Sequence, residues 1–84
     1  MAEYDAFGDF LENTAGHLGD ITLSFDQIGR ILARPLPAAA YKYRPWWGNE
    51  RLPTSHVQAE SWQRAGFVVD KVNMKKEWVR FRRI

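Results

Sequence analysis

The sequence predicts a single α+β domain, residues 1–84, with three helices and a small antiparallel sheet that ends in a C-terminal β-hairpin. Three observations lead to this fold class. Ser24 and Ser55 are each followed three residues later by glutamine, which is the capping-box pattern of a helix start. Residues 21–25 alternate apolar and hydroxyl side chains, as a strand does. The last two apolar stretches lie on either side of a lysine-rich turn.

The N-terminal part is expected to form two helices, one on either side of the first strand. Residues 3–13 place aromatic residues and a leucine on one helical face, with acidic residues in the first turns, where the helix dipole favours them. Residues 13–20 contain two glycines and are expected to form a loop. The second helix is expected to begin after Ser24 and to end at Arg34, because the residue before Pro35 is pushed out of the α region.

A connection of about 20 residues follows, which is longer than most loops within a domain. Residues 35–54 contain all four prolines of the chain. Pro37 is expected at the first position of a short helical turn that runs to Tyr41, since its fixed φ and missing N–H suit that position. The connection is therefore expected to have a structural or functional role of its own.

The most unusual residues in this connection are the adjacent Trp46 and Trp47. In an extended chain their rings would point to opposite sides, so that one anchors the connection and the other stays partly exposed. An exposed indole beside Arg44 and Arg51 is suited to stacking on a base or to gripping a peptide. The alternative is that both rings fill the core, since aromatic residues dominate the packing of small domains.

A third helix is expected to begin at Ser55, with Ala59 and Trp62 on its buried face, and to end before Gly66. His56 would then occupy the first helical position, near free backbone N–H groups that can hold a phosphate. The alternative is an exposed or locally bonded histidine, because the sequence offers it no ligand partner.

The C-terminal hairpin is expected to consist of strands over residues 67–74 and 78–82. In the last strand Val79 and Phe81 share one face, while the opposite face carries Trp78, Arg80 and Arg82. The hairpin is strongly basic and contains Lys71, Lys75, Lys76, Arg80, Arg82 and Arg83. These cations are suited to phosphate contacts, and the alternative is that they form a solvated face that prevents aggregation at the sheet edge.

The order of these elements is that of a winged helix, in which the last two strands form the wing. The departure is the long connection before the third helix, because the turn of a helix-turn-helix has about 3–4 residues. The fold is therefore expected to be winged-helix-like, with an insertion between its second and third helices.

Charge is segregated along the chain. The first 29 residues hold six acidic residues and no Lys or Arg, whereas residues 30–84 hold all 12 Lys and Arg and the other four acids. A basic, aromatic-rich segment favours a polyanion or an acidic protein surface as partner. The N-terminus lacks the basic region of a secretory signal, and no apolar run approaches the roughly 20 residues that span a bilayer. A cytoplasmic protein with no membrane partner is expected.

Catalysis has no comparable support in the sequence. There is no cysteine, the two histidines are far apart, and no nucleophile or metal motif is present. We therefore expect a protein that is not an enzyme and needs no cofactor or metal. The sequence leaves the oligomeric state open.

The resulting hypothesis is a nucleic-acid-binding domain, with DNA favoured over RNA as partner. Phosphate contacts are expected from the basic hairpin and the third helix, and stacking or base-edge contacts from the long connection. The candidate residues are Arg44, Trp46, Trp47, Asn49, Arg51, His56, Gln63, Arg64, Lys75, Lys76, Arg80 and Arg82. The alternative is a protein-protein interaction module, such as a small phage or mobile-element factor that docks on a host complex, with the same aromatic residues as a hot spot.

Two motifs in this region carry a family resemblance. The first is Trp46-Trp47-Gly48-Asn49, and the second is Ser55-His56-Val57-Gln58-Ala59 with Trp62. Together with apolar positions of the strand and helix that begin at Ile21, they resemble a small uncharacterised bacterial family, a domain of unknown function, over residues 21–82. The resemblance implies the architecture and implies that the two motifs form one surface. It implies no activity.

Overall fold

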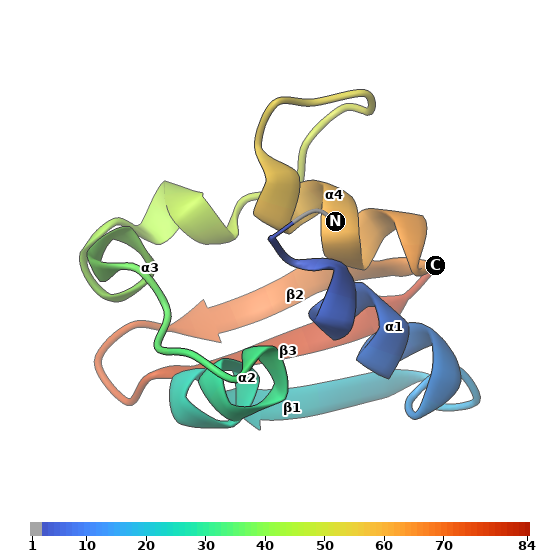
Figure 1. Ribbon diagram of the computed structural model, residues 1–84, viewed down its shortest axis with the longest axis horizontal. Helices are drawn as coiled ribbons and strands as arrows, with labels where there is room; N and C mark the ends of the chain where they lie inside the picture. The colour runs from blue at the N-terminus through green and yellow to red at the C-terminus, as the bar shows by residue number, and fades with distance from the viewer. Residues whose placement is uncertain (1–2) are drawn as a thin grey trace.

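The computed structural model describes residues 3–84 as a three-stranded antiparallel sheet with its helices gathered on one face (Figure 1). The elements in chain order are α1 (Asp5–Asn13), β1 (Asp20–Ser24), α2 (Phe25–Leu32), α3 (Ala38–Lys42), the 3-10 helix η1 (Arg44–Trp47), α4 (Val57–Arg64), β2 (Phe67–Asn73) and β3 (Trp78–Arg83). The strand order is β1-β3-β2, so the last strand lies in the centre. The expected α+β class and C-terminal hairpin are confirmed.

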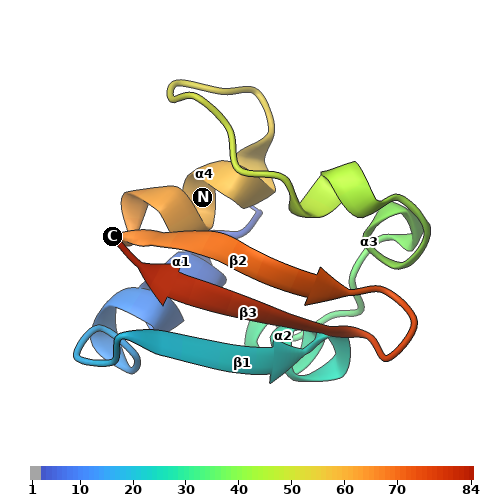
Figure 2. The same cartoon turned by 180° about the vertical axis from the view of Figure 1, so that it is seen from behind.

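The two faces of the sheet differ in polarity. Val79 and Phe81 of β3 are fully buried against the helices, opposite Leu23 and Ile21 of β1 in the antiparallel register. The alternating residues of β3, Trp78, Arg80 and Arg82, point to the other face, as the strand pattern predicts. No helix of residues 3–84 covers that outer face (Figure 2).

The ends of α2 follow local sequence signals. Its capping box is complete, because Ser24 Oγ accepts from the Gln27 N–H at 3.0 Å and Gln27 Oε1 accepts from the Ser24 N–H at 2.8 Å. The helix ends two residues before the predicted Arg34, since its C-cap Ala33 adopts a left-handed conformation with φ 60°. Gly66 has φ +92° after the end of α4, which confirms it as the C′ residue.

The start of α4 differs from the prediction. The N-cap is His56, not Ser55, and it makes no side-chain cap. The His56 N–H instead donates to Thr54 Oγ1 at 3.1 Å. Gln58 does not close a capping box, because its Nε2 donates to the carbonyl of Trp46 at 3.2 Å. Pro37 is likewise displaced by one position and is the N-cap of α3.

The connection between α2 and α4 is built from α3 and η1, which makes four α-helices in the described chain rather than three. Residues 33–56 separate α2 from α4, far more than the turn of about 3–4 residues in a helix-turn-helix. The winged-helix assignment, which is more specific than the α+β class, therefore stays a prediction.

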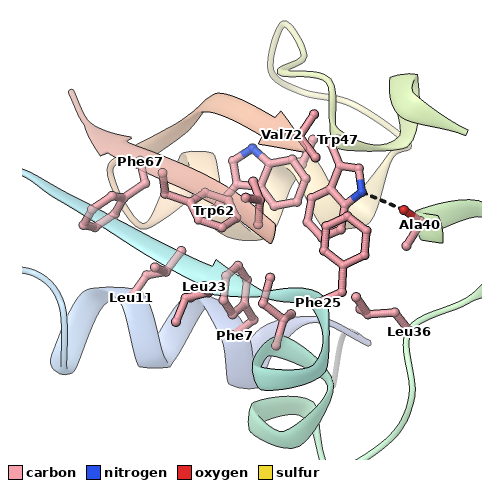
Figure 3. Packing of buried hydrophobic residues seen from close by; sticks show 14 of the residues in the cluster. Phe7, Leu11, Leu23, Phe25, Leu36, Ala40, Trp47, Trp62, Phe67 and Val72 are labelled. Atoms are coloured by element: carbon pink, nitrogen blue, oxygen red, sulfur yellow. Dashed lines mark hydrogen bonds between the residues drawn. The ribbon is translucent and has the colours of Figure 1, made fainter. Parts of the chain in front are cut away.

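Aromatic rings in mutual contact run through the core from α3 to α1. Successive ring centroids lie 4.8 to 6.4 Å apart along the row Tyr41, Phe25, Trp47, Trp62, Phe81, Phe7 and Phe10. Figure 3 shows Trp47 and Trp62 between Phe25 and the sheet. Aromatic side chains bury about 150–250 Å² each, so a short chain obtains a substantial core from few residues. The row also ties the long connection to both the helices and the sheet.

Candidate nucleic-acid interface

Asn49 joins the connection to the sheet and to α4. Its Oδ1 accepts from the Val69 N–H at 2.8 Å and from Trp62 Nε1 at 3.2 Å, and its Nδ2 donates to the Val69 carbonyl at 2.9 Å. Val69 lies at the irregularity in β2, on the edge strand of the sheet. The amide thus replaces a neighbouring strand at this point, which satisfies backbone groups that an edge would leave open. The structure thus commits the Asn49 amide to three hydrogen bonds within the protein, although the residue is exposed.

Two glutamines of α4 hold the same connection. Gln63 pairs with the backbone of Glu50 in both directions, accepting from its N–H and donating to its carbonyl, each at 2.6 Å. Gln58 holds the carbonyl of Trp46, as described above. The two sequence motifs therefore form one hydrogen-bonded unit. Gln63 was a candidate for nucleic-acid contact from sequence, but its amide bonds to the protein's own backbone.

Trp46 and Trp47 lie in a 3-10 helix and not in the extended chain that was considered from sequence. Their ring centroids are only 4.7 Å apart, with the planes at 75°. Trp47 is 2% exposed, and its Nε1 donates to the carbonyl of Ala40 at 2.8 Å (Figure 3). Trp46 is half-buried, against the rings of Tyr4 and Trp62. Trp47 thus lies entirely in the core, whereas Trp46 is only partly buried there.

Alanine substitutions are expected to separate the two tryptophans. Trp47→Ala removes a fully buried ring and should cost about 3–5 kcal/mol of unfolding free energy. Trp46→Ala should cost less, because part of that ring is already in water. If Trp46 is a partner contact, its substitution should also weaken binding by about 1–3 kcal/mol. Urea unfolding measures the first pair of values. Equal destabilisation by both substitutions would contradict the expected division.

The cations of the described residues fall into two groups. Five arginines have a carboxylate within ion-pair distance: Arg30 with Asp26, Arg34 with Glu3, Arg64 with Glu60, and both Arg80 and Arg82 with Asp70. The other seven make no ion pair within residues 3–84: Lys42, Arg44, Arg51, Lys71, Lys75, Lys76 and Arg83. Of the candidates from sequence, the second group contains Arg44, Arg51, Lys75 and Lys76.

Four of the unpaired cations gather at one end of the molecule. The N–H of Phe25 donates to the Glu77 carbonyl in the hairpin turn at 2.9 Å, and the Phe25 ring packs on Tyr41 of α3 at 5.4 Å. The hairpin turn and α3 therefore flank the same residue, and both lie at one end of the sheet (Figures 1 and 2). We call this surface the basic end, comprising Lys42, Tyr43, Arg44, Lys75 and Lys76.

Tyr43 is the residue of this surface that the sequence analysis missed. Its side chain is 60% exposed, between Lys42 and Arg44. Both backbone polar groups of Tyr43 are hydrogen-bonded. Its N–H donates to the Ala39 carbonyl and its carbonyl accepts from the Trp46 N–H, each at 2.9 Å. The ring is therefore presented on an ordered backbone. The sequence signal that could have identified Tyr43 is its position between two cations, Lys42 and Arg44, directly before the Arg44-Pro45 pair.

The opposite part of the molecule is acidic. A groove of about 160 Å³ between α1 and α4 is lined by Asp5, Asp9 and Glu12 of α1, together with Glu60 and Arg64 of α4. The guanidinium of Arg64 lies 3.1 Å from the Glu60 carboxylate. A polyanion approaching α4 would meet these carboxylates, so the geometry does not favour α4 as a phosphate-binding helix.

His56 is in an exposed position beside an acid. Its Nδ1 lies 3.4 Å from Glu50 Oε1, and its side chain is 58% exposed. The neighbouring carboxylate opposes the binding of an anion at this helix start. The structure thus corresponds to the locally bonded histidine that the sequence left as the alternative to a phosphate ligand.

A second hollow lies at the exposed side of Trp46. This cleft of about 350 Å³ is lined by Trp46, Tyr4, Val57 and the Pro35-Leu36-Pro37 segment, with Glu3 and Arg34 at its border. Burial raises the pKa of the Tyr4 phenol above its ordinary value of 10.0, and the charge of Glu3 adds to this while Arg34 opposes it. The phenol is therefore neutral at physiological pH, and the cleft combines apolar side chains with the polar Glu3, Arg34 and Gln58.

Two other features are absent from residues 3–84. No group of three or more His, Cys, Asp or Glu side chains is placed to hold a metal ion there. None of the helices in that range has both the length and the apolar character needed to cross a membrane.

Comparison with known proteins places the chain in a family. Nothing among the curated proteins matches the chain, and no solved structure matches it. Residues 4–84 match the family described as a domain of unknown function, DUF7662. Because the match covers nearly the whole chain, this protein belongs to the DUF7662 family, a small uncharacterised domain family of the kind that its motifs indicated.

Proposed function

We propose that this domain is a non-enzymatic nucleic-acid-binding module that contacts its ligand through the basic end. In this proposal Arg44, Lys75 and Lys76 lie on phosphates, and Tyr43 stacks on a base. The hairpin then acts as a winged-helix wing would, without a recognition helix in a groove. DNA is the first ligand to test, as the sequence analysis favoured.

The observation that carries the proposal is the distribution of cations without acidic partners. The unpaired cations of residues 3–84 are confined to 42–51 and 71–83, whereas arginines elsewhere face a carboxylate. An ion pair lowers the gain from a phosphate contact, because the cation must first leave its partner. An exposed ring between two unpaired cations adds the stacking surface that proteins use on nucleic acids.

The test is a salt titration of binding to a labelled DNA oligonucleotide, followed by fluorescence anisotropy. The logarithm of the binding constant should fall linearly with the logarithm of salt concentration, with a slope of about −0.7 to −0.9 per phosphate contacted. The variant Arg44→Gln, Lys75→Gln, Lys76→Gln should lose about two to three units of that slope and most of its affinity at low salt.

The matched control is Arg30→Gln, Arg34→Gln, Arg64→Gln, which removes the same charge from arginines that face carboxylates. These are exposed ion pairs, each worth about 0–1 kcal/mol, so the control should stay folded. It should also keep most of the salt slope. Equal losses in the two variants would mean that net charge alone drives binding, and would contradict a localised site.

The second candidate is a protein-protein interaction module, which the cleft beside Trp46 favours. Trp, Tyr and Arg, which are enriched in interface hot spots, all lie at this cleft. Binding of a protein partner there should depend on Trp46 and respond weakly to salt. The basic end should then be dispensable, which separates the two candidates in the same set of variants.

A further inference from the structure

The outer face of the sheet is open to solvent and carries a tryptophan. Figure 2 shows the three strands from this side, with the described helices behind them. Trp78 lies at the start of β3 on this face, next to the hairpin turn. In the register it stands between Ser24 of β1 and Asn73 of β2, so both of its cross-strand neighbours are short polar residues.

Trp78 differs from the other three tryptophans in its surroundings. Trp46, Trp47 and Trp62 contact one another and further rings of the aromatic row. Trp78 takes part in no ring contact within residues 3–84 and lies outside the core cluster, although it is only half-buried. Core packing therefore does not explain a large aromatic side chain at this position.

The hairpin that carries Trp78 has a net positive charge, because residues 67–84 hold six cations against two acids, Asp70 and Glu77. Asp70 is paired with Arg80 at 2.8 Å and Arg82 at 3.6 Å. Lys71 stands opposite Arg80 in the register and makes no ion pair within the described residues. Lys75 and Lys76 of the basic end follow β2 in the adjoining turn. The backbone of that turn is held in place, because the Lys76 N–H donates to Asn73 Oδ1 at 2.9 Å.

We propose that the outer face of the sheet binds single-stranded nucleic acid, with a base stacked on Trp78 and phosphates on Lys71, Lys75 and Lys76. This inference rests on the function proposed above and names its ligand class. The occupant follows from charge complementarity and from shape. An aromatic ring on a flat sheet reaches the π-face of an unpaired base, and any base has such a face. In a duplex those faces are covered by neighbouring bases, and exposing one costs unstacking and unpairing.

The experiment compares oligo(dT), oligo(U) and a DNA duplex of the same length, about 12 nucleotides, by anisotropy with the intact chain. Both single strands should bind more tightly than the duplex, since neither sugar changes the stacking on Trp78. Trp78→Ala should weaken single-strand binding about five- to 150-fold and leave duplex binding unchanged. Trp78→Phe should retain most of the affinity, because a smaller ring still stacks.

Two further results keep the test decisive. Trp78→Leu keeps an apolar side chain without a π-face, so it should lose single-strand affinity as Trp78→Ala does, even if the alanine variant folds poorly. Duplex binding that depends on Arg44, Lys75 and Lys76, with no preference for single strands and no effect of Trp78, would overturn this inference and leave the proposed function standing. Absence of salt-dependent binding to all three ligands would overturn the proposed function itself.

Discussion

Trp62→Ala is expected to remove a large part of the protein's stability. The Trp62 side chain is 1% exposed and lies in the middle of the aromatic row, in contact with Trp47 at 5.9 Å and Phe81 at 5.4 Å. Removing a buried ring of this size costs about 3–5 kcal/mol, and small domains have only about 5–15 kcal/mol of stability in total. Circular dichroism during urea unfolding measures the loss.

The control for this substitution is Trp62→Phe. It keeps an aromatic ring in the row but removes the Nε1–H that donates to Asn49. We expect a smaller loss, about 1–3 kcal/mol, from the missing volume and the lost hydrogen bond. A Trp62→Ala variant that melts close to the wild-type temperature would show that the inner face of α4 is not where the structure places it.

Asn49→Leu is expected to destabilise the protein through lost hydrogen bonds. Leucine has a similar volume, but it leaves the Val69 N–H and Trp62 Nε1–H without their acceptor and the Val69 carbonyl without its donor. A buried group left unsatisfied costs about 1–3 kcal/mol, but the two bonds to Val69 are exposed and water replaces them in part, whereas the Trp62 bond is part-buried. The expected loss of unfolding free energy is therefore about 1–3 kcal/mol.

Asn49→Asp separates the two bonds that the Asn49 side chain accepts from the one that it donates. Aspartate retains an acceptor for both N–H groups and loses only the donation to the Val69 carbonyl. It should cost less than leucine, whereas hydrogen exchange of the Val69 amide should accelerate mainly in Asn49→Leu. Unchanged exchange in Asn49→Leu would mean that the side chain does not protect this edge of the sheet.

The sequence predicted those parts of the fold that depend on local signals. The capping box at Ser24 forms because both partners lie within one helical turn. The C-terminal hairpin forms as expected, because alternation and a short turn determine its register. Gly66 ends α4 because glycine tolerates the left-handed backbone conformation found there.

Three polar side chains differ from the expectation for one physical reason. Gln58 has the right spacing for a capping box with Ser55, but its amide finds the carbonyl of Trp46 across the fold. The amides of Asn49 and Gln63 bond to backbone 20 and 13 residues away in sequence, so no local pattern reveals that they are occupied. Polar side chains that look available in sequence can thus be committed to tertiary structure.

The candidate site could be predicted in part. Charge segregation pointed to the hairpin, and its Lys75 and Lys76 make no ion pair within residues 3–84. The pairing of Arg80 and Arg82 with Asp70 could not be predicted in this way, because it depends on the register of the strands. Tyr43 could not be ranked above the other aromatic residues, since exposure is a property of the assembled fold.

The separation of the tryptophans into two environments gives this protein two independent optical signals. Trp46, Trp47 and Trp62 have ring centroids within 4.7 to 6.4 Å of one another, close enough for their excited states to couple. Their shared circular dichroism band therefore reports on the intact core and vanishes when the rings separate. Trp78 stands apart on the outer face, and its emission responds to solvent or to whatever covers that face. Loss of structure and occupation of the surface can thus be followed in the same unlabelled sample.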